Sequence, residues 1–298
     1  MNYKLNCIAA SLFTVVVSFL MVEKTAAQVN PILGMYYQNQ YLANPAYAGD
    51  NQGLTLNLGY KRELTKVEGT PVTNNITADY GMGKVGLGVN VNMDRDGLID
   101  IFRYTATYAY HLPINDESKV SFGLSAGVTT EKINTGNIIG DEGDTEIGWY
   151  NNQTAYIDGD FGAAYNYKNI TVQGVVPNLR KLFYKEEEER AYTPSTFYSA
   201  LSYKFIGEVT TLEPKVVYRG IKNYGNILDA GVNASFLKDS FNILALYHST
   251  KNLSAGLGFQ IDNKYQLQFA YTSPFSGTLR QYSEGNLSIG LKIHFLQK

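Results

Sequence analysis

The chain has 298 residues, which is enough for one or two domains. Its formal net charge of -2 excludes a basic surface for nucleic acid, and its mean hydropathy of -0.20 is too polar for a helical membrane protein. Aromatic residues make up 13% of the chain, and Tyr alone accounts for 24 positions. Tyrosine rings are amphipathic, so this composition suits a protein that lies at membrane–water interfaces.

Residues 1–27 have the pattern of a secretory signal peptide. Lys4 supplies the positive charge, residues 8–22 form an apolar stretch interrupted only by Ser and Thr, and Thr25–Ala27 provides small residues before a predicted cleavage site. The apolar stretch is too short for a comfortable membrane span. Because Cys7 is the only cysteine, we expect the mature chain to have no disulfide, no thiol nucleophile and no cysteine metal site.

The segment 28–52 differs from everything that follows it. Pro31 and Pro45 oppose a regular central strand, and Asn44-Pro45 and Gly49-Asp50 are typical turn sequences. The density of Tyr and Asn predicts a packed, hydrogen-bonded segment at the periplasmic mouth or inside the protein. We expect Gly49 to supply a backbone conformation that a Cβ atom would oppose.

From residue 53 to the end, apolar and polar residues alternate with a period of two. In the last candidate strand the odd positions from Leu287 to Phe295 are apolar, whereas the even positions from Ser288 to His294 are polar or small. Each strand therefore has one apolar face and one polar face. We predict fourteen strands, at about 53–62, 72–80, 84–93, 101–111, 119–130, 155–167, 169–176, 195–206, 211–220, 227–237, 240–248, 252–261, 264–273 and 285–296.

The connections between these strands also alternate in length. The even-numbered strands end in short turns, and most odd-numbered strands end in longer loops, with one exception near Ser249 to Lys251. Short periplasmic turns and long extracellular loops are typical of outer-membrane barrels. A soluble β-sandwich also alternates, but fourteen strands without an intervening helix disfavour it. We therefore predict an all-β fold: one transmembrane antiparallel β-barrel of about 14 strands over 53–298.

One short motif carries a family resemblance. The sequence Leu42-Ala43-Asn44-Pro45-Ala46-Tyr47-Ala48-Gly49 follows the aromatic-rich Tyr36-Tyr37-Gln38-Asn39. Together with the signal peptide and the all-β pattern, it resembles the N-terminus of the PorP/SprF family of type IX secretion system membrane proteins, found in Bacteroidetes. The resemblance implies a cell outer membrane component with no catalytic residues. Some members work with the periplasmic ring lipoprotein and its partner, whereas others recognise the C-terminal domain of one secreted adhesin and hold it at the cell surface.

Two candidate partner-binding sites follow. The first consists of Asn44, Pro45, Ala46, Tyr47 and Gly49, which can form a docking surface or an internal plug, or can simply close the periplasmic mouth and seat the first strand. The second is Trp149-Tyr150 in the long loop 131–154. A lone Trp in an extracellular loop is a reasonable protein contact, although it can equally fold back into the lumen.

No metal, cofactor or catalytic residue is expected. His111, His248 and His294 are placed at different ends of the strands, and Ser249 beside His248 points to the opposite face. The acidic residues of two loops can bind Ca²⁺ or a basic partner, but such runs are usually only solvated. They are Asp141, Glu142, Asp144, Glu146 and Glu186-Glu187-Glu188-Glu189.

The predicted lumen separates the candidate functions. Glycines of one parity leave space there for a partner peptide or for water, at Gly86, Gly88, Gly123, Gly127, Gly256 and Gly258. Few charged residues fall in mid-strand, namely Arg103, Asp158, Asp160, Lys215 and Asp229. The leading interpretation is a non-enzymatic type IX secretion component, embedded in outer-membrane lipid, that binds a secreted cargo protein. The alternative is a passive porin or small-molecule transporter; a third reading, a surface hydrolase, needs a convergent triad.

Overall fold

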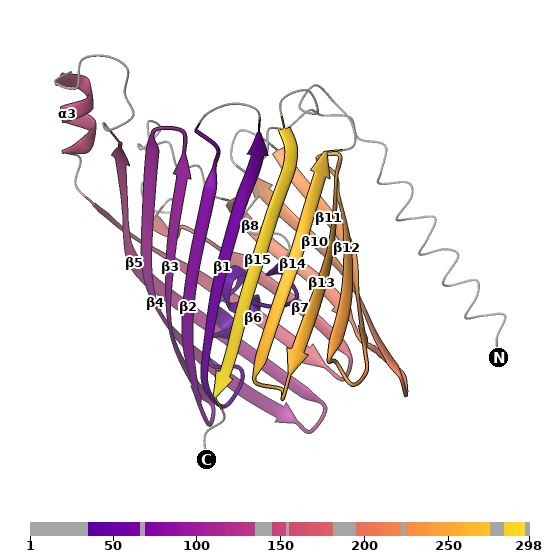
Figure 1. Ribbon diagram of the computed structural model, residues 1–298. Coiled ribbons are helices and arrows are strands. Elements are labelled where there is room, and N and C mark those ends of the chain that lie inside the picture. Colours follow the sequence, from indigo (N-terminus) through magenta and orange to yellow (C-terminus); the bar gives the residue numbers. More distant parts are fainter. Residues whose placement is uncertain are drawn as a thin grey trace.

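The computed structural model describes residues 35–65, 69–134, 145–152, 155–180, 195–221, 225–274 and 283–295. The predicted signal peptide lies outside the described residues. The described strands form one antiparallel sheet that closes on itself, because β1 pairs with both β2 and β15 and β10 pairs with β11 (Figure 1). Closure leaves no free edge, as a sheet in lipid requires.

The strands match the predicted ranges closely. They are β1 (Gly53–Thr65), β2 (Val72–Met82), β3 (Val85–Asp96), β4 (Ile99–Asn115), β5 (Ser118–Ile133), β6 (Tyr156–Tyr167), β7 (Ile170–Val176), β8 (Ser195–Tyr203), β9 (Phe205–Ile206), β10 (Thr210–Ile221), β11 (Gly225–Phe236), β12 (Phe241–His248), β13 (Asn252–Ile261), β14 (Tyr265–Pro274) and β15 (Ser283–Phe295). β8 and β9 both pair with β10 and are separated only by Lys204, so they form one interrupted strand. The barrel therefore has fourteen strands around its circumference. The predicted fold class is confirmed.

Two details differ from the prediction. The hairpin of β4 and β5 continues to Asn115 and Ser118, through residues expected to form a turn, with a register irregularity beside Pro113 that accommodates the missing N–H. The long connection after β5 contains a short helix, α3 (Thr145–Asn151), which the alternation pattern did not predict. In the described part of the chain, no helix is long and apolar enough to span a membrane.

The two faces of the barrel are inverted relative to a soluble protein. In β4, Tyr104 and Tyr108 lie on the outer face and are exposed, whereas Thr105 and Thr107 point inward and are buried. Exposed apolar side chains are common on the outer face, and buried Asn, Thr and Ser side chains line much of the lumen. This is the arrangement expected when lipid surrounds the barrel.

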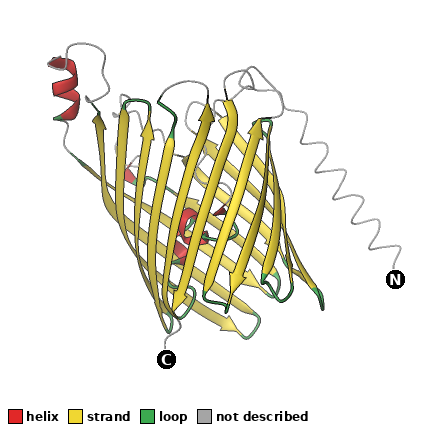
Figure 2. Ribbon diagram, viewed as in Figure 1, coloured by secondary structure: helices red, strands yellow, loops and turns green. Residues whose placement is uncertain are grey.

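The ends of the barrel also differ. Short turns join the strands at the end where β15 finishes, and α3 lies at the opposite end (Figure 1). Between the two ends, α2 (Gln40–Ala43) and the 3-10 helix η3 (Pro45–Tyr47) lie inside the barrel (Figure 2). We call residues 35–52, which precede β1, the plug.

Candidate functional site: the lumen plug

The Asn-Pro pair of the motif organises the plug. Asn44 ends α2 and begins η3: its backbone N–H bonds the Gln40 carbonyl, and its Oδ1 accepts from the Ala46 N–H at 2.9 Å. Pro45 then occupies the first position of η3, where its fixed φ is favourable and its missing N–H costs nothing. The motif is therefore a helix-capping sequence that folds the chain sharply within the lumen.

Asn44 also fixes the plug to the wall. It is fully buried, and its Nδ2 donates to Gln173 Oε1 on β7 at 3.1 Å and to the Ala163 carbonyl on β6 at 3.2 Å. Tyr41 adds a hydrogen bond from its hydroxyl to Thr107 Oγ1 on β4 at 2.7 Å. These contacts use side-chain chemistry, so they select the sequence of the plug.

Other wall residues bind the main chain of the plug. Lys215 Nζ on β10 donates to the Tyr36 carbonyl at 3.1 Å, and Lys292 Nζ on β15 donates to the Gln38 carbonyl at 3.4 Å. His111 Nε2 on β4 lies 3.0 Å from the Ala48 carbonyl and must carry the proton in that bond. These bonds do not depend on the plug side chains.

The last turn of the plug is held by charge. The Gly49 N–H donates to Asp79 Oδ2 on β2 at 3.0 Å, and Lys119 on β5 forms an ion pair with Asp50. The plug therefore contacts strands all round the barrel, from β2 to β15. That distribution distinguishes a cross-lumen element from a lid at one mouth.

Wall glycines make room for the plug. A Cβ atom at Gly86 would lie 1.8 Å from the Ala48 carbonyl oxygen, and one at Gly123 would lie 2.2 Å from the carbonyl carbon of Pro45. A Cβ atom at Gly88 would meet Tyr41 at 2.5 Å, and one at Gly162 would meet Asn44 at 2.1 Å. The space predicted inside the barrel is thus filled by the chain itself at these strands.

The same prediction was wrong for the other glycines singled out in the sequence. A Cβ atom at Gly127 would strike the Tyr104 carbonyl of the adjacent strand, and one at Gly256 the Phe269 carbonyl. Gly258 gives space to Asn242 and Gln268. These glycines allow close strand or side-chain packing and leave no room for a ligand.

Gly49 has the backbone conformation that the sequence predicted. Its φ is +64°, and a Cβ atom there would lie 2.5 Å from the Gly86 Cα. Two glycines, one in the plug and one in β3, therefore meet back to back. Only glycine satisfies both the left-handed φ and this close approach.

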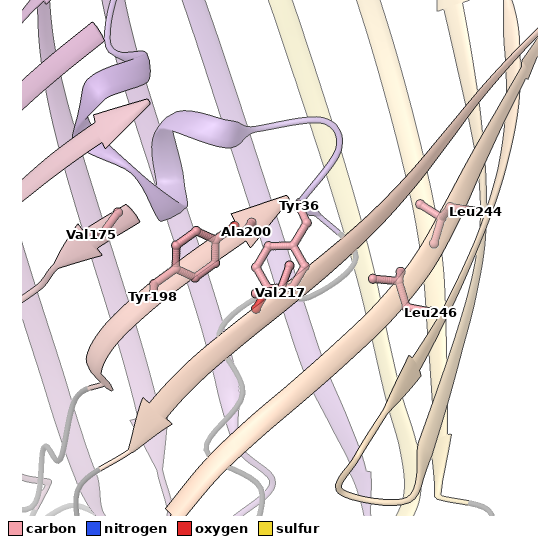
Figure 3. Close-up of a cluster of buried hydrophobic side chains, with 7 residues drawn as sticks. All are labelled: Tyr36, Val175, Tyr198, Ala200, Val217, Leu244 and Leu246. Atoms are coloured by element: carbon pink, nitrogen blue, oxygen red, sulfur yellow. The ribbon is translucent and has the colours of Figure 1, made fainter. Parts of the chain in front are cut away.

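An apolar seat receives the start of the plug. Tyr36 packs against wall residues of β7, β8, β10 and β12, and its ring centroid lies 6.0 Å from that of Tyr198 (Figure 3). Leu244 and Leu246 point into the lumen here, which explains why the alternation of 240–248 is weak in the sequence. The wall members of this seat are Val175, Tyr198, Ala200, Val217, Leu244 and Leu246.

The mid-strand charges predicted in the lumen are all engaged. Arg103 Nη2 donates to both oxygens of Asp160, at 2.9 and 2.8 Å, and Lys215 lies 3.5 Å from Glu213. Asp158 Oδ1 accepts the backbone N–H groups of Gly159 and Arg180. Such mutual pairing satisfies buried charge locally and leaves no arranged ring of these residues to select ions.

The fifth of these charges, Asp229, belongs to a chain of side chains that the sequence did not reveal. Asp229 Oδ1 lies 2.8 Å from His248 Nδ1, and His248 Nε2 lies 2.8 Å from Ser254 Oγ. Arg219 Nη2 holds the second oxygen of Asp229 at 2.8 Å, and Ser254 Oγ lies 2.6 Å from Thr272 Oγ1. Five neighbouring strands, β10 to β14, thus contribute one residue each.

This chain has the connectivity of an Asp-His-Ser triad but not the access. The side chains of Asp229 and His248 and the whole of Ser254 have no exposed surface. A nucleophile must reach its substrate, and the Ser254 hydroxyl is shared between His248 and Thr272. These five side chains therefore form a hydrogen-bonded network that links β10 to β14 on the lumen side of the wall. Sequence reasoning missed it because Ser254 lies across the β12–β13 turn from His248, whereas only the adjacent Ser249 was considered.

The second predicted site lies at the loop end, apart from the plug. Trp149 is 62% exposed on α3. Its neighbour Tyr150 donates to Glu131 Oε2 at 3.0 Å, and the Asn151 side chain bonds both the N–H and the carbonyl of Ile133, at 2.7 and 3.0 Å. α3 is therefore fastened to the end of β5 with Trp149 facing outward.

The predicted partner residues thus form two groups. Asn44, Pro45, Ala46, Tyr47 and Gly49 are buried together in the lumen, whereas Trp149 is exposed at the loop end. The acidic residues Asp141, Glu142, Asp144 and Glu186-Glu187-Glu188-Glu189 lie outside the described residues. Among the residues that are described, no group of three or more His, Cys, Asp or Glu side chains is disposed to hold a metal ion. Partner binding by either group stays a prediction.

Comparison with solved structures supports the barrel. The toluene transporter TbuX of Ralstonia pickettii aligns with a TM-score of 0.54 and 14% identity over 91% of this chain and 96% of its own. The CymD monoaromatic hydrocarbon channel gives 0.54 and 13% over 92% and 95%, and the toluene transporter TodX of P. putida gives 0.56 and 11% over 88% and 95%. At such identities the likeness concerns the fold alone.

Sequence comparison identifies the family. No curated protein matches this chain. The family model for the type IX secretion system membrane protein PorP/SprF matches residues 25–293 and so includes both the plug and nearly the whole barrel. With its capping Asn-Pro motif seated in the lumen of a closed fourteen-stranded wall, the chain is an outer-membrane β-barrel that belongs to the PorP/SprF family.

Proposed function

We propose that this protein is a non-enzymatic scaffold of type IX secretion that binds a secreted cargo protein, through the cargo's C-terminal domain, and anchors or routes it at the outer membrane. Family membership supports the link to secretion. Docking to the periplasmic ring, through its lipoprotein and that protein's partner, is a second contact that the same role would use. The proposed cargo is a class of protein: an exported protein with a dedicated C-terminal domain.

The plug is the observation that carries the scaffold role. It crosses the lumen and is hydrogen-bonded to strands on several sides of the barrel, including β2, β4, β7, β10 and β15. The predicted mid-strand charges are paired with other charged side chains or with backbone N–H groups. A barrel whose lumen is filled in this way suits holding a protein better than passing small solutes.

A transport function is the alternative. The structural neighbours named above are hydrocarbon transporters, and the lumen of this barrel contains an apolar patch around Tyr198 and Leu244. Tyr36 of the plug packs on that patch, so a solute would have to replace it. Conductance and solute-uptake measurements on the purified barrel in liposomes separate the two functions, because a transporter conducts or takes up solute with the plug in place.

Affinity purification tests the proposal directly. The barrel is tagged in the connection 181–194, crosslinked in the intact outer membrane and gently solubilised, and the co-purifying proteins are identified by mass spectrometry. We expect a large secreted protein or its C-terminal domain, with or without periplasmic ring components. Recovery of the barrel alone, while an unrelated complex in the same membrane survives the procedure, would contradict the scaffold role.

A further inference from the structure

The plug resembles a bound peptide more than a wall element. Wall side chains donate hydrogen bonds to its main-chain carbonyls at Tyr36, Gln38 and Ala48. Its main-chain N–H at Gly49 donates to the wall carboxylate of Asp79. Any peptide that can adopt the same folded backbone offers the same carbonyl and N–H groups at these positions. Plug side chains add sequence selectivity, and Tyr36 adds an aromatic anchor. The side chains that bond the wall are those of Gln38, Asn39, Tyr41, Asn44 and Asp50.

Several buried polar atoms of the plug receive no hydrogen bond from the protein. Among the described residues, ten buried side-chain oxygen or nitrogen atoms have no hydrogen-bond partner in the protein, and five of them belong to the plug. These five are the hydroxyls of Tyr36, Tyr37 and Tyr47 and the amide oxygens of Gln38 and Gln40. The seated position gives these five groups no hydrogen bond to the protein, so they do not oppose release of the plug.

The wall beneath the plug has a shape that matches parts of the plug other than those five polar atoms. Gly86 and Gly123 give space to the plug main chain, and Gly88 and Gly162 give space to the side chains of Tyr41 and Asn44. The apolar seat accepts the ring of Tyr36. Without the plug, the wall would offer a groove floor of glycine, lysine and histidine beside an apolar pocket. That surface suits a peptide with an aromatic residue and, about eight positions later, Asn-Pro followed by small residues.

From these observations we propose that the lumen is a peptide-binding site that the plug occupies in cis, and that a peptide segment of a secreted protein enters by displacing the plug. The identity of the peptide's owner rests on the proposed function, whereas the site itself rests on the plug contacts. The plug then acts as a built-in competitor, and the barrel becomes receptive only to a peptide that matches its wall.

Cysteine protection measures displacement, because the mature chain is predicted to contain no cysteine. Ala46→Cys places a thiol at a position with no exposed surface, and Tyr47→Cys provides a second reporter that creates space should the first variant fail to fold. Ser254→Cys is the matched control, since it is equally buried but belongs to the wall. Leu237→Cys, in an exposed turn, sets the rate for free access.

The probe is a synthetic peptide of residues 35–52, added in trans to the purified full-length barrel, with a scrambled peptide of the same composition as control. Because labelling follows the displaced population, we expect maleimide to react with Ala46→Cys about tenfold faster at saturating peptide, with Ser254→Cys unchanged. Substituting the tyrosine and asparagine equivalent to Tyr36 and Asn44 by alanine in the peptide should abolish the effect.

Two outcomes would overturn the proposal. Unchanged labelling of both plug reporters at saturating peptide would show that the plug is a permanent part of the wall. A parallel rise at Ser254→Cys would show that the barrel loosens as a whole. Recovery of secretion partners in the purification experiment, together with either result, would leave the scaffold role intact and remove only the peptide site.

Discussion

Single glycines decide whether the plug can seat. Gly86→Ala and Gly123→Ala would each drive a methyl group into the plug main chain, at Ala48 and Pro45. Overpacking against backbone costs about 1–3 kcal/mol or more, since backbone cannot rotate away as a flexible side chain can. We expect both variants to lower the midpoint of urea unfolding in detergent and to raise labelling of Ala46→Cys.

Gly174→Ala is the control for these variants. It also changes a strand glycine, but the added Cβ atom would have only the Tyr198 carbonyl within 4 Å, at 3.9 Å. Its unfolding midpoint and its plug protection should match the parent. If Gly174→Ala is as damaging as Gly86→Ala, the cost reflects strand glycine in general and the plug contact is not the cause.

The Asp229, His248 and Ser254 chain makes an equally local prediction. Because Ser254 is fully buried and shares its hydroxyl with Thr272, a fluorophosphonate probe should not label the native barrel. Ser254→Ala should leave partner capture unchanged, and Asp229→Asn should destabilise the barrel by several kcal/mol by leaving the buried Arg219 without its counter-charge. Labelling that disappears in Ser254→Ala would reveal a hydrolase instead.

These residues also show which features of the plug site can be predicted from the sequence. Strand glycines predicted lumen space correctly at Gly86, Gly88 and Gly123 but not at the other three positions, and Gly49 predicted its left-handed backbone conformation from local stereochemistry. The sequence did not show that the plug occupies this space. That contact brings Gly49 against Gly86 of β3, which lies 37 positions later in the chain. The contact of His248 with Ser254 depends on strand register, which no pattern of single residues fixes.

At the scale of elements, the plug fills the centre of the lumen. Deleting residues 35–51 removes its hydrogen bonds to Thr107, Gln173 and Lys215 and opens the centre of the barrel. We expect the deletion variant in planar bilayers to show a larger and steadier conductance than the full chain. Equal conductance of the two proteins would mean that the plug does not obstruct the path and would favour a transporter.

The helix α3 offers a spectroscopic reporter. Trp149 is the only tryptophan of the chain, and it is exposed, while Asn151 and Tyr150 fasten the helix to β5. If a partner docks at the loop end, Trp149 emission should shift to shorter wavelength and acrylamide quenching should fall, because burial removes water from the ring. Asn151→Ala should weaken the response by releasing the helix.

Docking only at the turn end leaves the Trp149 signal unchanged. Phe205→Trp then reports on that end, since Phe205 is exposed beside the β9–β10 turn. A response from Trp149 with none from the second reporter assigns the partner to the loop end. No response from either, with a partner known to co-purify, contradicts docking at both surfaces.

The whole molecule was the most predictable scale. Fourteen strands, their parity and the alternation of turn and loop lengths all follow from the period of two, which is a property of the backbone repeated along the chain. The antiparallel pairing of β1 with β15, which starts at Leu54 and Phe295, closes the sheet into a barrel. The helix α3 escaped prediction because it is a short helix of 7 residues within a connection, where no sheet imposes a period.

Orientation is the prediction that belongs to this scale. Short turns should face the periplasm and α3 the outside, because long connections are translocated outward during barrel assembly. Gly148→Cys lies on α3 with open space around it, and Lys238→Cys lies in the β11–β12 turn. In intact cells, an impermeant maleimide should label Gly148→Cys at once and Lys238→Cys only after the outer membrane is permeabilised. The reverse order would place the loop end, with Trp149, in the periplasm, so that any cargo contact there would precede export. The turn end, towards which Asp50 of the plug lies, would then face the medium.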